Sequence, residues 1–122
     1  MKKLRVMIVE DDSLIADLLA ELIEAFGHEI CAIESTEGGA VAAAGQFKPD
    51  LMIVDAHLRQ GSGIGAVETI SRSGHVPHIF VTGDASAVRT LKPAATILQK
   101  PYFELELILA IKAALTETNS AA

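Results

Sequence analysis

The sequence has little cysteine and few aromatic residues. Its 122 residues include one cysteine, one tyrosine and no tryptophan. Cys31 has no partner for an internal disulfide, and the apolar residues around it indicate a buried, unreactive thiol. The composition therefore gives no sign of an oxidising compartment.

Basic residues and long hydrophobic runs are also scarce. Ten Lys and Arg stand against sixteen Asp and Glu, which gives a formal charge of −6. This balance disfavours non-specific binding to nucleic acid or to an anionic membrane. The apolar stretch at residues 6–9 stops at Glu10, too early for a signal peptide or a membrane span. We expect a cytoplasmic protein that binds neither nucleic acid nor membrane.

Apolar residues, by contrast, make up half of the chain, and 21% of the residues are charged. Such a composition excludes disorder. The length fits one domain, residues 1–122, that buries roughly two thirds of its unfolded-chain surface. Residues 116–122 are small and polar, and we expect them to form a disordered tail.

Short apolar runs alternate with segments of helical periodicity. The runs predict strands at residues 4–9, 30–33, 51–54, 78–81 and 96–98. The periodic segments predict helices at residues 14–26, 39–47, 65–73, 85–92 and 102–115. Because crossovers between parallel strands are right-handed and each must cover a face, this alternation predicts an α/β fold, a parallel sheet with helices on both sides.

Details of three helices also follow from the sequence. Ser13 is a candidate cap for the first helix, and Gly27 a candidate stop signal. The fourth helix must be short, because Pro93 disfavours helical geometry before it. The last helix is unusually apolar, with a predicted stripe of Leu105, Ile108, Ile111 and Leu115 that Leu107 and Leu109 widen.

Polar residues follow four of the predicted strands. Ligands of open parallel sheets bind beyond the carboxyl ends of the strands, so these residues should share one edge. In chain order they are Glu10, Asp11 and Asp12, then Asp55, Thr82 and Lys100. Carboxylates gathered at one edge repel each other unless they take up protons or share a cation, and Mg²⁺ suits such a cluster.

This donor set suits phosphoryl transfer. Beside a divalent cation, Asp55 could act as a carboxylate nucleophile toward phosphorus and form an acyl phosphate. Lys100 would balance one phosphoryl oxygen, and the Thr82 hydroxyl could hydrogen-bond another.

The four strand-end motifs, in this order, closely resemble the receiver domain of two-component response regulators, over residues 4–115. The resemblance implies a flavodoxin-like, doubly wound sheet of five strands in the order 2-1-3-4-5 with five helices. It also implies that Asp55 accepts a phosphoryl group from a histidine kinase or a phosphotransfer protein. The implied Mg²⁺ ligands are Glu10, Asp11, Asp55 and the backbone carbonyl of His57. Asp12 is left as a helix N-terminal charge, and the Lys100–Pro101 bond is expected to be cis.

The sequence departs from the common receiver pattern in its last third. Ile97 stands where most receivers have an aromatic residue that reports phosphorylation, and the segment from 82 to 100 is shorter than usual. Pro77, Phe80, Thr82 and Gly83 partly match a stand-alone receiver subset that lacks the aromatic switch. That subset implies a histidine kinase of the HWE or a related class as the partner.

The leading hypothesis is a phosphorylation-dependent response regulator whose output is binding to a downstream protein, since we expect no effector domain after residue 115. We expect a monomer or weak dimer that acts as no enzyme beyond its own phosphotransfer and dephosphorylation. One alternative is a phosphatase of the haloacid dehalogenase type. That family needs a second Asp two residues after its nucleophile, where this chain has His57. The other alternative is a degenerate receiver that serves as a constitutive interaction module.

Overall fold

Five apolar segments form the strands of one parallel sheet. The computed structural model describes residues 2–121, with side chains described as far as Thr116. The strands are β1 (Arg5–Val9), β2 (Glu29–Glu34), β3 (Leu51–Asp55), β4 (His78–Thr82) and β5 (Thr96–Gln99). They lie in the order β2-β1-β3-β4-β5, and every pair is parallel. This is the flavodoxin-like order that the resemblance implied.

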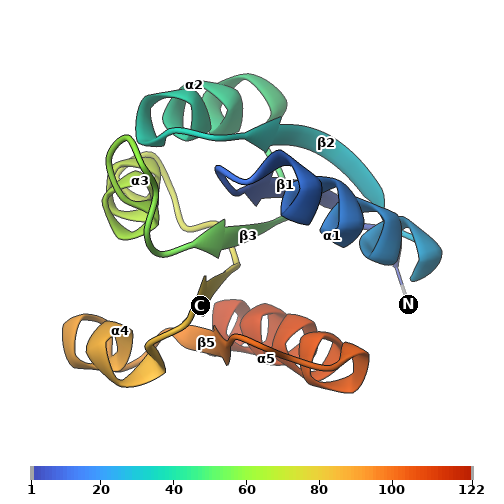
Figure 1. Ribbon diagram of the computed structural model, residues 1–122. Helices are drawn as coiled ribbons and strands as arrows, with labels where there is room; N and C mark the ends of the chain where they lie inside the picture. Colours follow the sequence, from blue (N-terminus) through green and yellow to red (C-terminus); the bar gives the residue numbers. More distant parts are fainter. Residues whose placement is uncertain (1, 122) are drawn as a thin grey trace.

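Helices cover both faces of the sheet (Figure 1). They are α1 (Ser13–Ala25), α2 (Glu37–Phe47), α3 (Gly63–Ser71), α4 (Ala85–Leu91) and α5 (Glu104–Ala121). Side chains of α1 and α5 pack on one face, and those of α2, α3 and α4 on the other. Successive strand residues alternate between these layers, so Ile53 lies in the first core and Met52 in the second. Both layers are needed because the apolar residues in the middle of the strands point alternately to the two faces.

The N-cap of the first helix is not the residue that its sequence suggested. Asp12, and not Ser13, is the N-cap, because its side chain accepts hydrogen bonds from the N–H groups of Leu14 and Ile15. The Ser13 prediction was therefore wrong. Gly27, with a φ of +94°, follows the helix as expected. The assignment of Asp12 as a helix N-terminal residue is confirmed.

The last helix buries only part of the stripe that its sequence predicted: Ile111 is buried and Leu115 packs against the core, but other members of the stripe face outward. Leu105 is 64% exposed, and Leu109 is exposed as well. The buried residues are Leu107, Ala110, Ile111 and Ala114. The helix is apolar on several sides, so periodicity could not single out the buried one. Small alanines allow it to pack closely on the sheet.

Two further helices, α4 and α5, show features that the sequence did not predict. In α4, Val88 is buried but Leu91 is 66% exposed, so this short helix has one apolar anchor. In α5 the backbone is helical to Ala121, although we expected a tail over residues 116–122. No proline or glycine interrupts that segment, so nothing in it ends the helix. Ala122 lies outside the described residues.

The topology creates a crevice at one edge of the sheet. The chain leaves β1 toward α1 on one face and β3 toward α3 on the other. The carboxyl ends of β1 and β3, which are neighbours, thus lie where the connections part. Such a switch point is where ligands bind in doubly wound sheets.

Candidate functional site

Three carboxylates meet at this crevice. Val9 pairs with Val54, so Glu10 and Asp55 follow the last paired residues of two adjacent strands. One oxygen each from Glu10, Asp11 and Asp55 lies within 4.8 Å of the others. Hard oxygen donors at this spacing match the preference of Mg²⁺. The residues that the sequence assigned to a metal through their side chains are therefore brought together and fit such an ion.

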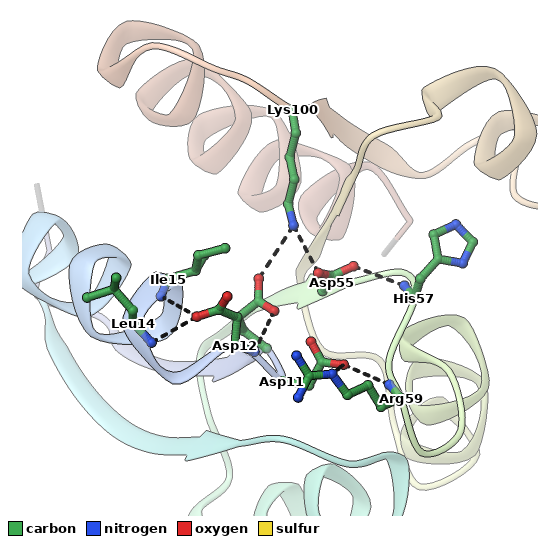
Figure 2. A network of polar contacts seen from close by, with 9 residues as sticks. Asp11, Asp12, Leu14, Ile15, Asp55, His57, Arg59 and Lys100 are labelled. Carbon is green, nitrogen blue, oxygen red and sulfur yellow. Dashed lines mark hydrogen bonds and ion pairs between the residues drawn. The ribbon is translucent and has the colours of Figure 1, made fainter.

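A lysine that directly follows the edge strand β5 reaches the same cluster. Lys100 Nζ lies 3.0 Å from Asp55 Oδ2 and 3.5 Å from Glu10 Oε1 (Figure 2). The backbone N–H of Lys100 donates to the Thr82 carbonyl at 2.8 Å, which fixes the start of the side chain beside β4. The Lys100–Pro101 peptide bond is cis, as expected.

Burial and charge oppose each other at Glu10 and Lys100. Glu10 is only 6% exposed, and burial raises the pKa of its carboxyl, with the nearby charge of Asp55 adding to the effect. Burial by itself would lower the pKa of Lys100, but its hydrogen bond to Asp55 and the charges of Asp55 and Glu10 outweigh it and raise that pKa. Lys100 therefore stays cationic beside the carboxylates.

Asp11 faces the loop that follows β3. Its Oδ2 accepts the Arg59 backbone N–H at 2.7 Å, and Arg59 Nε lies 3.9 Å away. The backbone hydrogen bond is the main reason that the pKa of Asp11 is lowered. Asp12 instead turns to α1, as Figure 2 shows. The two adjacent acids thus belong to different environments.

The same loop also contacts Asp55 through a backbone hydrogen bond. The His57 backbone N–H donates to Asp55 Oδ1 at 3.0 Å, while the His57 ring points away from the carboxylates (Figure 2). The side chain of His57 thus takes no part in the cluster, in line with the backbone role expected for it. Binding of a metal by its carbonyl stays a prediction.

Thr82 lies at the end of β4, next to β3. Val81 pairs with Asp55, so Thr82 stands one residue beyond the nucleophile candidate. Its side chain is buried, and its hydroxyl oxygen accepts the Asp84 N–H at 3.0 Å. This hydrogen bond joins Thr82 to the β4–α4 loop. A contact between the Thr82 hydroxyl and a phosphoryl group stays a prediction.

Sequence reasoning missed the contacts of Arg59 and Gln99. Gln99 Nε2 donates to the Gly83 carbonyl at 2.7 Å, and Gln99 Oε1 accepts the Ala85 N–H at 2.8 Å, so β5 is joined to the loop after Thr82. Neither residue belongs to a periodic pattern or to a motif of fixed spacing in the sequence. Only the adjacency of Gln99 to Lys100 could have drawn attention to it.

An open cavity of about 500 Å³ adjoins the carboxylates. Asp55, Glu10 and Lys100 form its polar part, and Ile15, Leu19 and Tyr102 are among its apolar walls. Burial raises the pKa of the Tyr102 hydroxyl. The cavity leaves Asp55 open to an incoming group.

The chain thus combines a flavodoxin-like sheet with an acidic cluster and a lysine at its switch point, which is the arrangement that the resemblance to receiver domains implied. The chain belongs to the response regulator receiver domain family, whose model matches residues 6–112. It is 32% identical over 120 residues to the phyllosphere-induced regulator PhyR of Methylorubrum extorquens, covering 95% of this chain and 45% of that protein. It is 33% identical over 116 residues to the transcriptional regulatory protein PdtaR of Mycobacterium tuberculosis, covering 92% of this chain and 57% of that protein. The chain spans about half the length of these curated relatives.

Solved structures show the same similarity. The response regulator REC domain of Erythrobacter litoralis PhyR superposes with a TM-score of 0.85 at 33% identity, covering 95% of this chain and 92% of that one. The anti-anti-sigma factor PhyR of Bartonella quintana gives a TM-score of 0.84 at 30% identity, covering 99% of this chain and 51% of that one. Within residues 2–121, no helix has the length and apolar character needed to span a membrane.

Proposed function

We propose that this chain is a phosphorylation-dependent switch of two-component signalling in which Asp55 is the phosphoacceptor. The observation that carries the proposal is the placement of Asp55 at an open cavity, with Lys100 Nζ 3.0 Å away and two further carboxylates beside it. The phosphodonor is a histidine kinase, of the HWE class, or a phosphotransfer protein.

In the proposed reaction, a carboxylate oxygen of Asp55 attacks the phosphorus of a phosphohistidine. An O–P bond forms, the N–P bond breaks, and its electron pair stays with the imidazole of the donor. Lys100 offsets negative charge that gathers on the phosphoryl oxygens, as phosphoryl transfer requires. Water later hydrolyses the acyl phosphate, which restores the Asp55 carboxylate and releases inorganic phosphate.

Glu10, Asp11 and Asp55, with the His57 carbonyl, would hold Mg²⁺. When bound, the ion neutralises charge between the carboxylates and the phosphoryl oxygens. The side chains contribute the charge and the hard oxygen donors, and Lys100 limits the repulsion among them before the phosphoryl group arrives.

The signal leaves the site through Thr82 in this proposal. A hydroxyl that accepts the Asp84 N–H can still donate its own hydrogen to a phosphoryl oxygen. Moving Thr82 moves the loop after β4 and changes how α4 is presented. Ile97 is not aromatic and takes no part in this route.

The output is binding to a downstream protein, with no direct contact to nucleic acid or membrane. PhyR of Bartonella quintana is titled an anti-anti-sigma factor, which supports an output by protein binding. A single half-buried cysteine, whose pKa is raised by burial, suits the reducing cytoplasm. We propose a monomer or weak dimer.

The test is phosphorylation by acetyl phosphate, followed by intact-mass spectrometry with and without Mg²⁺. The wild type should gain one phosphoryl group only with the metal, and Asp55→Asn should gain none. The matched control Asp17→Asn, an exposed acid on α1, should label like the wild type. Equal labelling of Asp55→Asn, or labelling that a chelator leaves unchanged, would remove Asp55 and the acid cluster from these roles.

A further inference from the structure

One carboxylate fastens the β3–α3 loop, residues 56–62, to α2. Glu37 is the first residue of α2, and its Oε1 accepts the Ser62 backbone N–H at 2.8 Å. The backbone N–H of Glu37 in turn donates to the Gln60 carbonyl at 3.2 Å. Two hydrogen bonds from one residue thus hold the far end of the loop, where Ser62 caps α3.

Two glycines make room for this carboxylate. A Cβ on Gly61 would lie 2.7 Å from Glu37 Oε1, and one on Gly65 would lie 2.8 Å from Oε1 and 2.9 Å from Oε2. These distances are shorter than real Cβ contacts. Gly61 also has a φ of +84°, which side chains rarely adopt. The loop and the start of α3 are therefore shaped around the Glu37 side chain.

The other end of the loop carries the contacts to the acidic cluster. Arg59 donates its N–H to Asp11, and His57 donates its N–H to Asp55. His57 pairs with Ser62 in an isolated antiparallel bridge, so the two ends of the loop are joined. A displacement at Ser62 would thus be passed across this bridge to His57 and on to the site.

We propose that Glu37 is a positioning residue that sets the orientation of Asp11 and of the His57 carbonyl for metal binding. The proposal rests on the function given above. Glu37 touches neither the metal ligands nor the phosphoacceptor, and it acts through the loop. Its required feature is the oxygen acceptor aimed at Ser62, and its charge at the N-terminus of α2 is secondary.

The first experiment compares Mg²⁺ binding by Glu37→Ala, Glu37→Gln and the exposed control Glu21→Ala. Amide NMR titration is the method, because the chain has no tryptophan and one tyrosine. Glu37→Ala should weaken binding about tenfold, the low end of what outer-shell partners of metal sites contribute. Glu37→Gln keeps an acceptor oxygen and should retain affinity within a factor of about three, and Glu21→Ala should match the wild type. Wild-type affinity in Glu37→Ala, or an equal loss in Glu37→Gln, would overturn the proposal.

A second variant reaches the same contact from the opposite side. Gly65→Ala should push the Glu37 carboxylate away from Ser62 at little cost to folding, because the group displaced is the end of a flexible side chain. It should lower Mg²⁺ affinity in an otherwise wild-type chain and have no further effect when combined with Glu37→Ala. An equal effect of Gly65→Ala in both backgrounds would contradict the proposal. Where Glu37→Ala folds poorly, an unchanged Mg²⁺ affinity of Gly65→Ala alone would overturn it.

Hydrogen exchange in the metal-free protein separates this proposal from the proposed function. Glu37→Ala should speed exchange of the Arg59 amide, at the site end of the loop, as well as that of Ser62. If wild-type chain binds no Mg²⁺, the proposed function fails, but exchange at Arg59 still decides the role of Glu37. Faster exchange at Ser62 with an unchanged Arg59 would show that the loop does not pass the displacement on.

Discussion

Asp11 and Asp12 are adjacent in the sequence but contact different parts of the molecule. Asp11 lies in the carboxylate cluster and accepts the Arg59 N–H, whereas Asp12 accepts two N–H groups of α1. The same charge therefore stabilises a helix at Asp12, whereas at Asp11 it belongs to the proposed metal site. Each role has its own measurable consequence.

We predict that Asp11→Ala mainly affects metal binding and that Asp12→Ala mainly affects stability. Asp11→Ala should strongly weaken Mg²⁺ binding, measured by amide NMR titration, because it removes a carboxylate ligand. Asp12→Ala should leave that affinity nearly unchanged and lower the free energy of unfolding by about 1 kcal/mol, the usual cost of losing an N-cap. If both variants weaken binding equally, the assignment of the acid pair is wrong.

His28 is a second residue whose environment defines its state. It is buried, and its Nδ1 lies 3.0 Å from the Leu4 N–H as an acceptor. Burial and the positive N-terminus lower its pKa below 6.5. An acceptor at Nδ1 requires the neutral ring, so protonation must break this contact.

The pH dependence of stability follows from this shift. Between pH 6.5 and the lowered pKa, the unfolded chain binds more protons at His28 than the folded one, so stability falls as the pH falls through that window. In His28→Asn, whose side-chain oxygen can replace Nδ1, the free energy of unfolding should depend less on pH there. Urea denaturation from pH 7 downward measures this, and an unchanged slope would show that other groups cause it.

At the scale of elements, α4 is the helix with the weakest attachment. It has seven residues, and Val88 is its one buried side chain. Isolated helices below about 12–15 residues are marginal in water, so α4 depends on its contacts. Gln99 supplies one of these contacts, by accepting the N–H of Ala85, and it also donates to the carbonyl of Gly83 in the loop just before the helix.

We predict that α4 amides exchange faster than those of α1, and that Gln99→Ala increases the difference. One of the lost hydrogen bonds is to α4 itself and the other is to the loop before it. At about 1 kcal/mol each, the loss of one or both should make exchange in α4 roughly 5- to 30-fold faster. The exposed control Gln46→Ala on α2 should leave α4 unchanged. Exchange in α4 as slow as in α1 would contradict this description of the helix.

At the scale of the whole molecule, one sheet separates two cores. Met52 and Ile53 are adjacent on β3, are both fully buried and face opposite layers. Because every strand contributes to both layers, neither layer can be lost alone. The sheet therefore makes unfolding cooperative.

We predict that Met52→Ala and Ile53→Ala each lower the free energy of unfolding by about 2–5 kcal/mol, as large-to-small changes in a core do. Unfolding should stay a single transition by circular dichroism and by NMR in both variants. Leu14→Ala is the matched control, since this leucine is 66% exposed, and should change stability by at most about 0.5 kcal/mol. Separate transitions in either core variant would show that the layers unfold independently.

The sequence by itself determined the elements and the edge at which the site lies. Five apolar runs, alternating with helical segments, were enough to predict the parallel sheet, because strand and helix periodicities are local properties. Asp55 and Lys100 could be assigned because each lies at the carboxyl end of a predicted strand, and parallel strands end at one edge. The strand order came from the resemblance, and the structure has that order.

Tertiary structure alone decided which side of each apolar helix is buried and how the site is held. Leu107 and Leu105 of α5 are equally apolar, and only packing on the sheet buries the first and exposes the second. The bonds of Arg59 to Asp11 and of Ser62 to Glu37 join residues 48 and 25 positions apart. Such contacts carry no periodic signal, because they depend on where folding brings two loops together and not on the pattern within either one.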